Sequence, residues 1–157
     1  MIDQATISEF RQRYNECFAC GSENPIGLHI DPIESREDGT VEGRFTPRPG
    51  FAGFENTLHG GVVSTALDEI SAWAAMVNAG KLVYTAKLEI RFRRPASSDS
   101  EFLIRSRITE SRGRRFMIEA EMLDGDVLVA SSTGLFVEAF DMAEESRSQS
   151  SEPGADV

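Results

Sequence analysis

One long helical pattern followed by four strand-like runs most limits what this chain can fold into. Between residues 60 and 79 apolar side chains recur every three or four positions, and Gly80 stands where a helix would end. Apolar and polar residues then alternate over residues 82–94, 102–109, 115–123 and 127–137. Because alternation with a period of two is typical of strands with one buried face, we expect a sheet packed against a single core helix.

Smaller elements are expected before this helix. The spacing of apolar residues predicts a short amphipathic helix over residues 3–15, and a loop rich in glycine, asparagine and proline follows it. A turn at residues 37–39 joins two expected strands, 28–33 and 40–45, and residues 47–57 are expected to form a loop. This order of elements predicts an α+β domain with a largely antiparallel sheet.

The length of 157 residues fits one domain. We expect an N-terminal helix over residues 1–16, a domain over residues 17–140, and a disordered acidic tail over residues 141–157, where serine, glutamate and glutamine dominate. The sequence has no apolar run of the roughly 18 residues that span a bilayer and no secretory signal pattern. We therefore expect a cytoplasmic protein without a membrane partner.

Charge is unevenly distributed along the chain. The net charge of −10 argues against general nucleic-acid binding, yet residues 81–115 contain 10 basic and 4 acidic residues, a net charge of +6. One helix cannot cover both faces of six strands, so the other face or an edge of the sheet needs a partner. We therefore expect the chain to self-associate.

The tripeptide His59-Gly60-Gly61 stands where the loop becomes the long helix. Backbone N–H groups at a helix start lack acceptors within the helix, and glycines let a ligand approach them. Together with the helix dipole, these groups would stabilise an oxyanion. The alternative is a flexible helix cap in which His59 packs or accepts a hydrogen bond.

Asp68 is the candidate for acid–base chemistry. At about 100° per residue it lies opposite the apolar stripe, on the face of Gly61 and Ser64, and this face would line a cleft about 10 Å long. The alternative is an ordinary solvated helix face. Glu69 is a rival carboxylate about 100° around the helix, and the residues alone do not choose between the two.

Two segments resemble a known family: HGGVVSTALDE at residues 59–69 and YTAKLEIRFRRP at residues 84–95. They are similar to the hotdog-fold acyl-CoA thioesterases of the phenylacetate-pathway (PaaI-like) type, and the upstream NPIGL at residues 24–28 is similar to a lead-in of that group. The resemblance covers residues 15–138. It implies a hotdog fold, in which a curved antiparallel sheet wraps around one long central helix. It also implies a hydrolase that forms a homodimer or homotetramer with active sites between subunits.

The resemblance also implies residue roles. Asp68, nine positions after His59, matches the catalytic general base or nucleophile, and Gly60 or Gly61 matches the backbone donor to the thioester oxygen. Thr85 matches a hydroxyl residue that the neighbouring subunit supplies to orient the attacking water. Strict alternation, however, puts Thr85 on the strand face opposite Leu88.

Substrate contacts are less clearly marked. Many relatives have Asn or Gln six residues before the histidine, where this chain has Gly53, and Asn56 is the candidate substitute. Arginines are candidates for the coenzyme A phosphates because they bind phosphate in a bidentate manner. These are Arg91, Arg93 and Arg94 near one strand end and Arg112, Arg114 and Arg115 around a turn. The alternative is that they are solvated charges on strand faces.

Rival functions are a hotdog-fold dehydratase, whose different motif is absent from the sequence, and a non-catalytic acyl-CoA binding protein. We expect no cofactor and no metal. Cys17 and Cys20 are either half of a zinc site or part of a structural loop, and the sequence favours the loop because it has no second cysteine pair. The acyl group is not readable: Phe51, Phe54, Trp73 and Met76 are candidates for its pocket and equally for the core.

Overall fold

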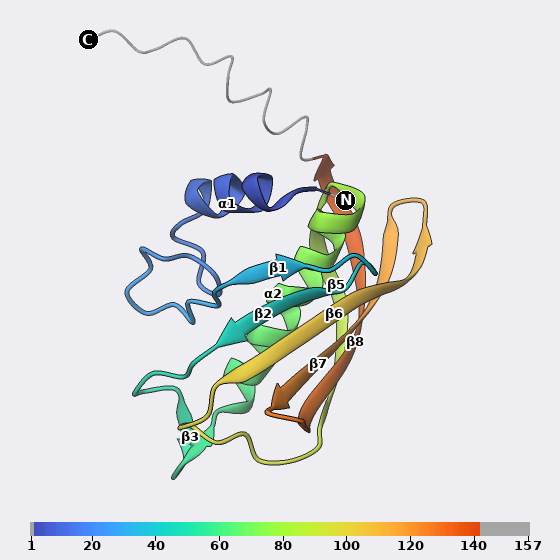
Figure 1. The fold of residues 1–157 in the computed structure, drawn as a ribbon. Coiled ribbons are helices and arrows are strands. Elements are labelled where there is room, and N and C mark those ends of the chain that lie inside the picture. The colour runs from blue at the N-terminus through green and yellow to red at the C-terminus, as the bar shows by residue number, and fades with distance from the viewer. Residues whose placement is uncertain (1, 142–157) are drawn as a thin grey trace, which may run out of the picture.

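The computed structural model describes residues 2–141. A six-stranded antiparallel sheet curves around one long helix, α2 (Gly60–Ala79), as Figure 1 shows. In spatial order the strands are β1 (Ile33–Ser35), β2 (Val41–Phe45), β6 (Phe102–Arg112), β7 (Arg115–Asp124), β8 (Val127–Asp141) and β5 (Lys81–Phe92). A short helix, α1 (Gln4–Arg13), and a separate hairpin of β3 (Ala52–Phe54) and β4 (Thr57–Leu58) complete the domain. This is the expected hotdog fold.

The helix α2 has the predicted bounds because both of its ends carry capping residues. His59 is the N-cap, and Gly80 ends the helix in the left-handed conformation, with φ of 65°. Between them Leu67, Ile70 and Ala74 are fully buried under the sheet. Burying each large apolar side chain contributes roughly 1.5–3 kcal/mol. No helix within residues 2–141 is both long and apolar enough to cross a membrane.

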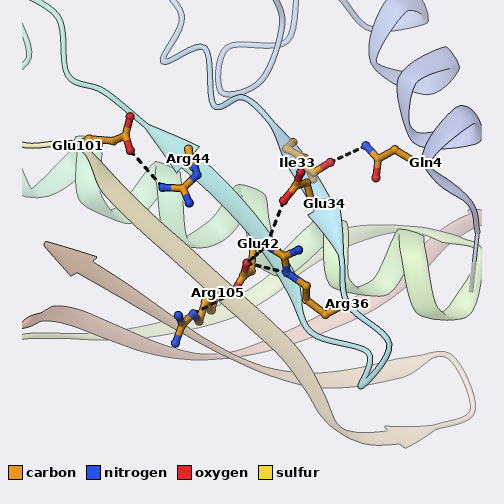
Figure 2. Close-up of polar contacts among 8 residues, drawn as sticks. All are labelled: Gln4, Ile33, Glu34, Arg36, Glu42, Arg44, Glu101 and Arg105. Carbon is orange, nitrogen blue, oxygen red and sulfur yellow. Dashed lines mark hydrogen bonds and ion pairs between the residues drawn. The ribbon is translucent and has the colours of Figure 1, made fainter. Parts of the chain in front are cut away.

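The two faces of the sheet differ in character. On the inner face, Ile104 and Ile118 are fully buried against α2. On the outer face, Glu42 accepts hydrogen bonds from Arg36 Nε at 2.8 Å and Arg105 Nε at 3.0 Å (Figure 2). Alternation thus buries one face, as expected, and the other face is polar enough for water. The polar outer face does not call for a covering layer, so we expect any partner at an edge of the sheet.

Among residues 2–141 the strand β5 is one edge of the sheet, since β8 is its only partner there. It is 12 residues long, and it exposes Tyr84 (67%) and Phe92 (57%). A long edge strand with exposed aromatic side chains is a typical place for another chain to pair.

Several expected elements differ from the structure. Only Ile33 of the strand expected at residues 28–33 lies in β1, because the backbone N–H groups of Leu28 and Ile30 donate instead to Phe18 O (2.8 Å) and Ala19 O (3.0 Å). Both side chains are buried, so their apolar pattern reflects the core and not a sheet. The expected loop 47–57 contains β3 and the start of β4. The expected tail begins one residue too early, since Asp141 ends β8, and residues 142–157 lie outside the described residues.

Candidate active site

The helix start is capped by its own histidine. His59 Nδ1 accepts a hydrogen bond from the N–H of Gly61 at 2.9 Å, and His59 O accepts one from Val62 N at 2.9 Å. The N–H of Gly60 has no hydrogen-bond acceptor within the described part of the chain. Of the two expected oxyanion donors, the N–H of Gly60 is therefore available, and the N–H of Gly61 is engaged by His59.

Close packing surrounds this turn. A Cβ atom at Gly60 would lie 3.5 Å from the ring of Phe92, and one at Gly53 would lie 3.1 Å from His59 Cα. The absence of a side chain at residue 53 therefore lets β3 approach the histidine. Asn56, the expected substitute, has φ of 56° in the turn between β3 and β4, and its side chain makes no hydrogen bond with the described residues. The structure does not bring Asn56 into the site.

The hydroxyl of Thr85 donates a hydrogen bond to Asp68 Oδ1 at 2.7 Å. Asp68 is half-buried in the middle of α2, and Thr85 is exposed near the start of β5. This contact differs from the expectation in that both residues belong to one chain. A carboxylate that holds a hydroxyl at an accessible surface is a typical arrangement for positioning water.

A β-bulge explains how Thr85 reaches the helix. In the pairing of β5 with β8, Lys87 lies opposite Leu135 and Thr85 opposite Phe136, so Ala86 is an extra residue. One extra residue reverses the side-chain alternation, which puts Thr85 on the inner face with Leu88. The prediction that Thr85 faces away from Leu88 is therefore wrong.

Ser64 lies on α2 between the helix start and Asp68. Its hydroxyl donates to Gly60 O at 2.8 Å, so its proton is engaged by the helix backbone. The hydroxyl oxygen still has lone pairs for a ligand. Ser64 can therefore accept a hydrogen bond but is not a free donor.

The structure separates the two candidate carboxylates by their partners. Glu69 Oε1 accepts a hydrogen bond from Trp73 Nε1 at 2.9 Å, and both carboxylate oxygens of Glu69 lie 3.9 Å from Cys17 Sγ. Burial, followed by the nearby Cys17, raises the pKa of Glu69 to about 7. Glu69 thus faces the cysteines, whereas Asp68 faces Thr85.

Both cysteines are free thiols beside Glu69. The hydrogen bond between the two thiols, aided by the backbone N–H groups of residues 19–21, lowers the pKa of Cys17 to about 5. The same hydrogen bond, with burial, raises the pKa of Cys20. Glu69 was not predicted as their neighbour, because Cys17 and Glu69 are 52 residues apart in the chain.

The two basic groups lie at opposite ends of the sheet, so they do not form one phosphate site in a single chain. Arg93 and Arg94 follow β5, where their backbone N–H groups donate to Val129 O at 2.8 and 3.1 Å. Arg115 instead lies opposite Val137, near the other end of β8. Figure 1 shows the β6–β7 turn far from the start of α2. Within the first group, Arg93 lines a cleft with Glu89 on the outer face of the sheet.

An apolar cavity of about 400 Å³ lies among α1, α2 and the ends of β5 and β8. Trp73 and Met76 line it, as does the cluster of Cys17, Cys20 and Glu69. The other expected pocket residues lie elsewhere: Phe54 is 83% exposed, and Phe51 stacks on Phe45 with ring centroids 6.4 Å apart.

Sequence comparisons find similar proteins among the thioesterases. The model of the thioesterase superfamily matches residues 55–131. The chain is 27% identical to the acyl-coenzyme A thioesterase THEM4 of Bos taurus over 138 residues, which is 87% of this chain and 56% of that protein. It is 31% identical to an uncharacterized protein of Schizosaccharomyces pombe over 112 residues, 68% of this chain and 63% of that protein. The chain thus spans only part of the length of both relatives.

Solved structures share the fold. A thioesterase superfamily protein superposes with a TM-score of 0.72 and 26% identity, covering 79% of this chain and 61% of that one. PaaI of E. coli superposes with a TM-score of 0.74 at 16% identity, covering 90% of this chain and 98% of that one. A hypothetical thioesterase from Streptococcus pneumoniae, solved with coenzyme A, superposes with a TM-score of 0.65 at 17% identity, covering 70% of this chain and 89% of that one. The chain therefore has the hotdog fold of these proteins, and its residues 55–131 are similar to the thioesterase superfamily.

Proposed function

We propose that the protein is an acyl-CoA thioesterase, which hydrolyses the thioester to a free acid and coenzyme A. The observation that carries this proposal is the accessible hydrogen bond between Asp68 and Thr85, on the helix whose first turn leaves the Gly60 N–H without an acceptor in the described chain. The match of residues 55–131 to the model of the thioesterase superfamily supports the reaction class. The name of the bovine relative supports coenzyme A as the leaving group.

In the proposed reaction Asp68 removes a proton from water as the water oxygen bonds to the thioester carbonyl carbon. The carbonyl electron pair moves onto oxygen, which becomes an oxyanion. Collapse of this intermediate breaks the carbon–sulfur bond, and the coenzyme A thiolate takes the proton from Asp68. In the alternative route the Asp68 carboxylate attacks the carbonyl carbon itself, and the carbon–sulfur bond breaks to release the coenzyme A thiolate and leave an anhydride. Water then hydrolyses the anhydride to the free acid and the Asp68 carboxylate, and the remaining proton of that water protonates the thiolate.

The start of α2 is the proposed oxyanion site. The N–H of Gly60 is directed by the first helical turn and is reinforced by the helix dipole. The N–H of Gly61 joins it if His59 Nδ1 releases its hydrogen bond when substrate binds. His59 thus acts as a positioning residue in this proposal.

Thr85 and Ser64 are the proposed polar contacts along the cleft. Thr85 already donates to Asp68, so its oxygen is free to accept a hydrogen bond from the attacking water. Asn56 does not enter the mechanism, because its side chain makes no hydrogen bond with the described residues.

For the phosphates of coenzyme A we propose Arg94, with Arg93 in a lesser role because it lines the outer face of the sheet. The exposed edge of β5 supports a homodimer or homotetramer whose active sites lie at the subunit interface. The free thiols of Cys17 and Cys20 agree with the proposed cytoplasmic location, where thiols stay reduced.

Chromatographic measurement of free coenzyme A from a panel of acyl-CoAs tests the proposed function. We expect release with at least one acyl group at a rate proportional to enzyme concentration. Binding of acyl-CoA without release would identify a non-catalytic binding protein. Loss of water from a hydroxyacyl-CoA, with the thioester intact, would identify a dehydratase.

A further inference from the structure

We propose that Cys17, Cys20 and Glu69 form a binding site for one divalent transition-metal ion, with zinc as the best match. The three side chains come from two segments, a loop after α1 and the middle of α2. Their ligand atoms all lie within 4.8 Å of one another. This site is separate from the Asp68–Thr85 pair and does not depend on the proposed thioesterase activity.

The distances fit a tetrahedral ion with little movement. Zinc bonds of about 2.3 Å to sulfur and 2.0 Å to oxygen separate neighbouring ligand atoms by roughly 3.5–3.8 Å. Cys17 Sγ already lies 3.9 Å from each carboxylate oxygen of Glu69. Side-chain shifts of a few tenths of an ångström would therefore complete these contacts.

Backbone contacts hold the cysteine loop in a tight turn. Gly21 N donates to Cys17 O at 2.9 Å, which closes the turn around the two thiols. A Cβ atom at Gly21 would lie 2.3 Å from Asn15 O and 2.4 Å from Cys17 N, so only glycine fits there.

Neighbouring side chains orient the third ligand and balance its charge. Trp73 Nε1 donates to Glu69 Oε1, which fixes the carboxylate and leaves Oε2 for an ion. Two thiolates and a carboxylate would concentrate three negative charges, and a divalent cation offsets two of them. Arg11 also lies in this region, since its Nη2 donates to Cys20 O at 3.2 Å.

The preference for zinc follows from the donor set. Two soft thiolates with one carboxylate select zinc over magnesium or calcium, which prefer ligand sets made only of oxygen. Because the three residues line the 400 Å³ cavity, the fourth position of the ion opens to solvent, where water can bind. A bound ion would tie the cysteine loop to α2, across 52 residues of sequence.

Zinc titration of the full chain tests the proposal, after removal of metal and under reducing conditions. In competition with a chromophoric chelator we expect one zinc ion per chain, and thermal unfolding should shift to higher temperature when zinc is present. Cobalt in place of zinc should give the near-ultraviolet absorption of cobalt–thiolate bonds. Absence of stoichiometric zinc binding would overturn the proposal.

Variants assign the ligands. Glu69→Gln should lower zinc affinity at least tenfold. Cys17→Ser removes one of the two thiolates, so it should reduce the cobalt–thiolate absorption by the share of that one bond. Glu9→Gln makes the same change at an exposed position of α1 and should leave affinity unchanged. Full zinc affinity in Glu69→Gln would show that Glu69 is not a ligand and would overturn the proposed site. So would a Cys17–Cys20 disulfide that resists reduction in the freshly isolated protein.

Discussion

Asp68 and Thr85 are 17 residues apart in the chain, and they meet because β5 runs back along α2. If Thr85 positions the attacking water, Thr85→Ala should lower kcat for coenzyme A release by roughly tenfold to a hundredfold. Thr85→Ser retains the hydroxyl and should retain most of the rate. Equal losses in both variants would contradict a role for the hydroxyl.

The cap at His59 has a measurable effect on stability. Removing the acceptor in His59→Ala leaves the Gly61 N–H unpaired and should lower the free energy of unfolding by about 1 kcal/mol in urea titrations. Asparagine is a good N-cap residue, so His59→Asn should unfold close to the wild-type midpoint. If alanine and asparagine destabilise equally, the imidazole acts through packing and not as an acceptor.

At the residue level the sequence pattern found Asp68 but did not distinguish it from Glu69. A helical wheel gives the direction in which a side chain points, but it does not give the residues that the side chain contacts. Trp73 and Cys17 hold Glu69, and the second of these comes from a segment 52 residues away. The partners of each carboxylate therefore needed the structure.

Among the elements, α2 was predicted to the residue, whereas the bulge in β5 was not. The helix carries its own end signals at His59 and Gly80, which act locally. The extra residue Ala86 becomes visible only through pairing with β8. The hairpin of β3 and β4 was not predicted, because its strands of three and two residues are too short to show alternation of apolar and polar residues.

The contact between β2 and α2 depends on a glycine. A Cβ atom at Gly43 would lie 2.4 Å from Ile70 Cδ1 and 2.9 Å from Ile30 Cγ2. Overpacking of this kind should lower the free energy of unfolding of Gly43→Ala by roughly 1–3 kcal/mol in chemical denaturation.

A second substitution checks the cause of that loss. Ile70→Val removes the Cδ1 methyl group and costs roughly 0.5–1.5 kcal/mol on its own. In the double variant the methyl group added by Gly43→Ala would no longer meet Cδ1, so the loss should be smaller than the sum of the single losses. Strict additivity would show that the strain has another source.

For the whole molecule, the edge of β5 predicts assembly. We expect light scattering at micromolar concentration to give the mass of two or four chains, because a 12-residue edge strand pairs readily with a second copy. Hydrogen exchange of the β5 amides should be slow in the assembly and should speed up on dilution. An active monomer with fast exchange in β5 at every concentration would contradict an active site between subunits.

The arrangement of charges over the molecule was only partly predictable. Counting residues located the basic stretch, but not the fact that its two arginine groups lie at opposite ends of the sheet. Strand length and register decide that separation, because β6 extends for 11 residues before Arg112 pairs with Arg115 at the turn into β7. In an assembly, arginines of a second chain can complete a phosphate site that one chain does not form.

The central claim is that Asp68 activates hydrolysis, and the kcat for coenzyme A release by Asp68→Asn tests it most directly. The control is Asp126→Asn, the same change at an exposed residue in the turn between β7 and β8. We predict that kcat falls by roughly a hundredfold or more in Asp68→Asn, with the circular dichroism spectrum unchanged, and stays near wild type in Asp126→Asn. A folded Asp68→Asn that releases coenzyme A at the wild-type rate would contradict the account.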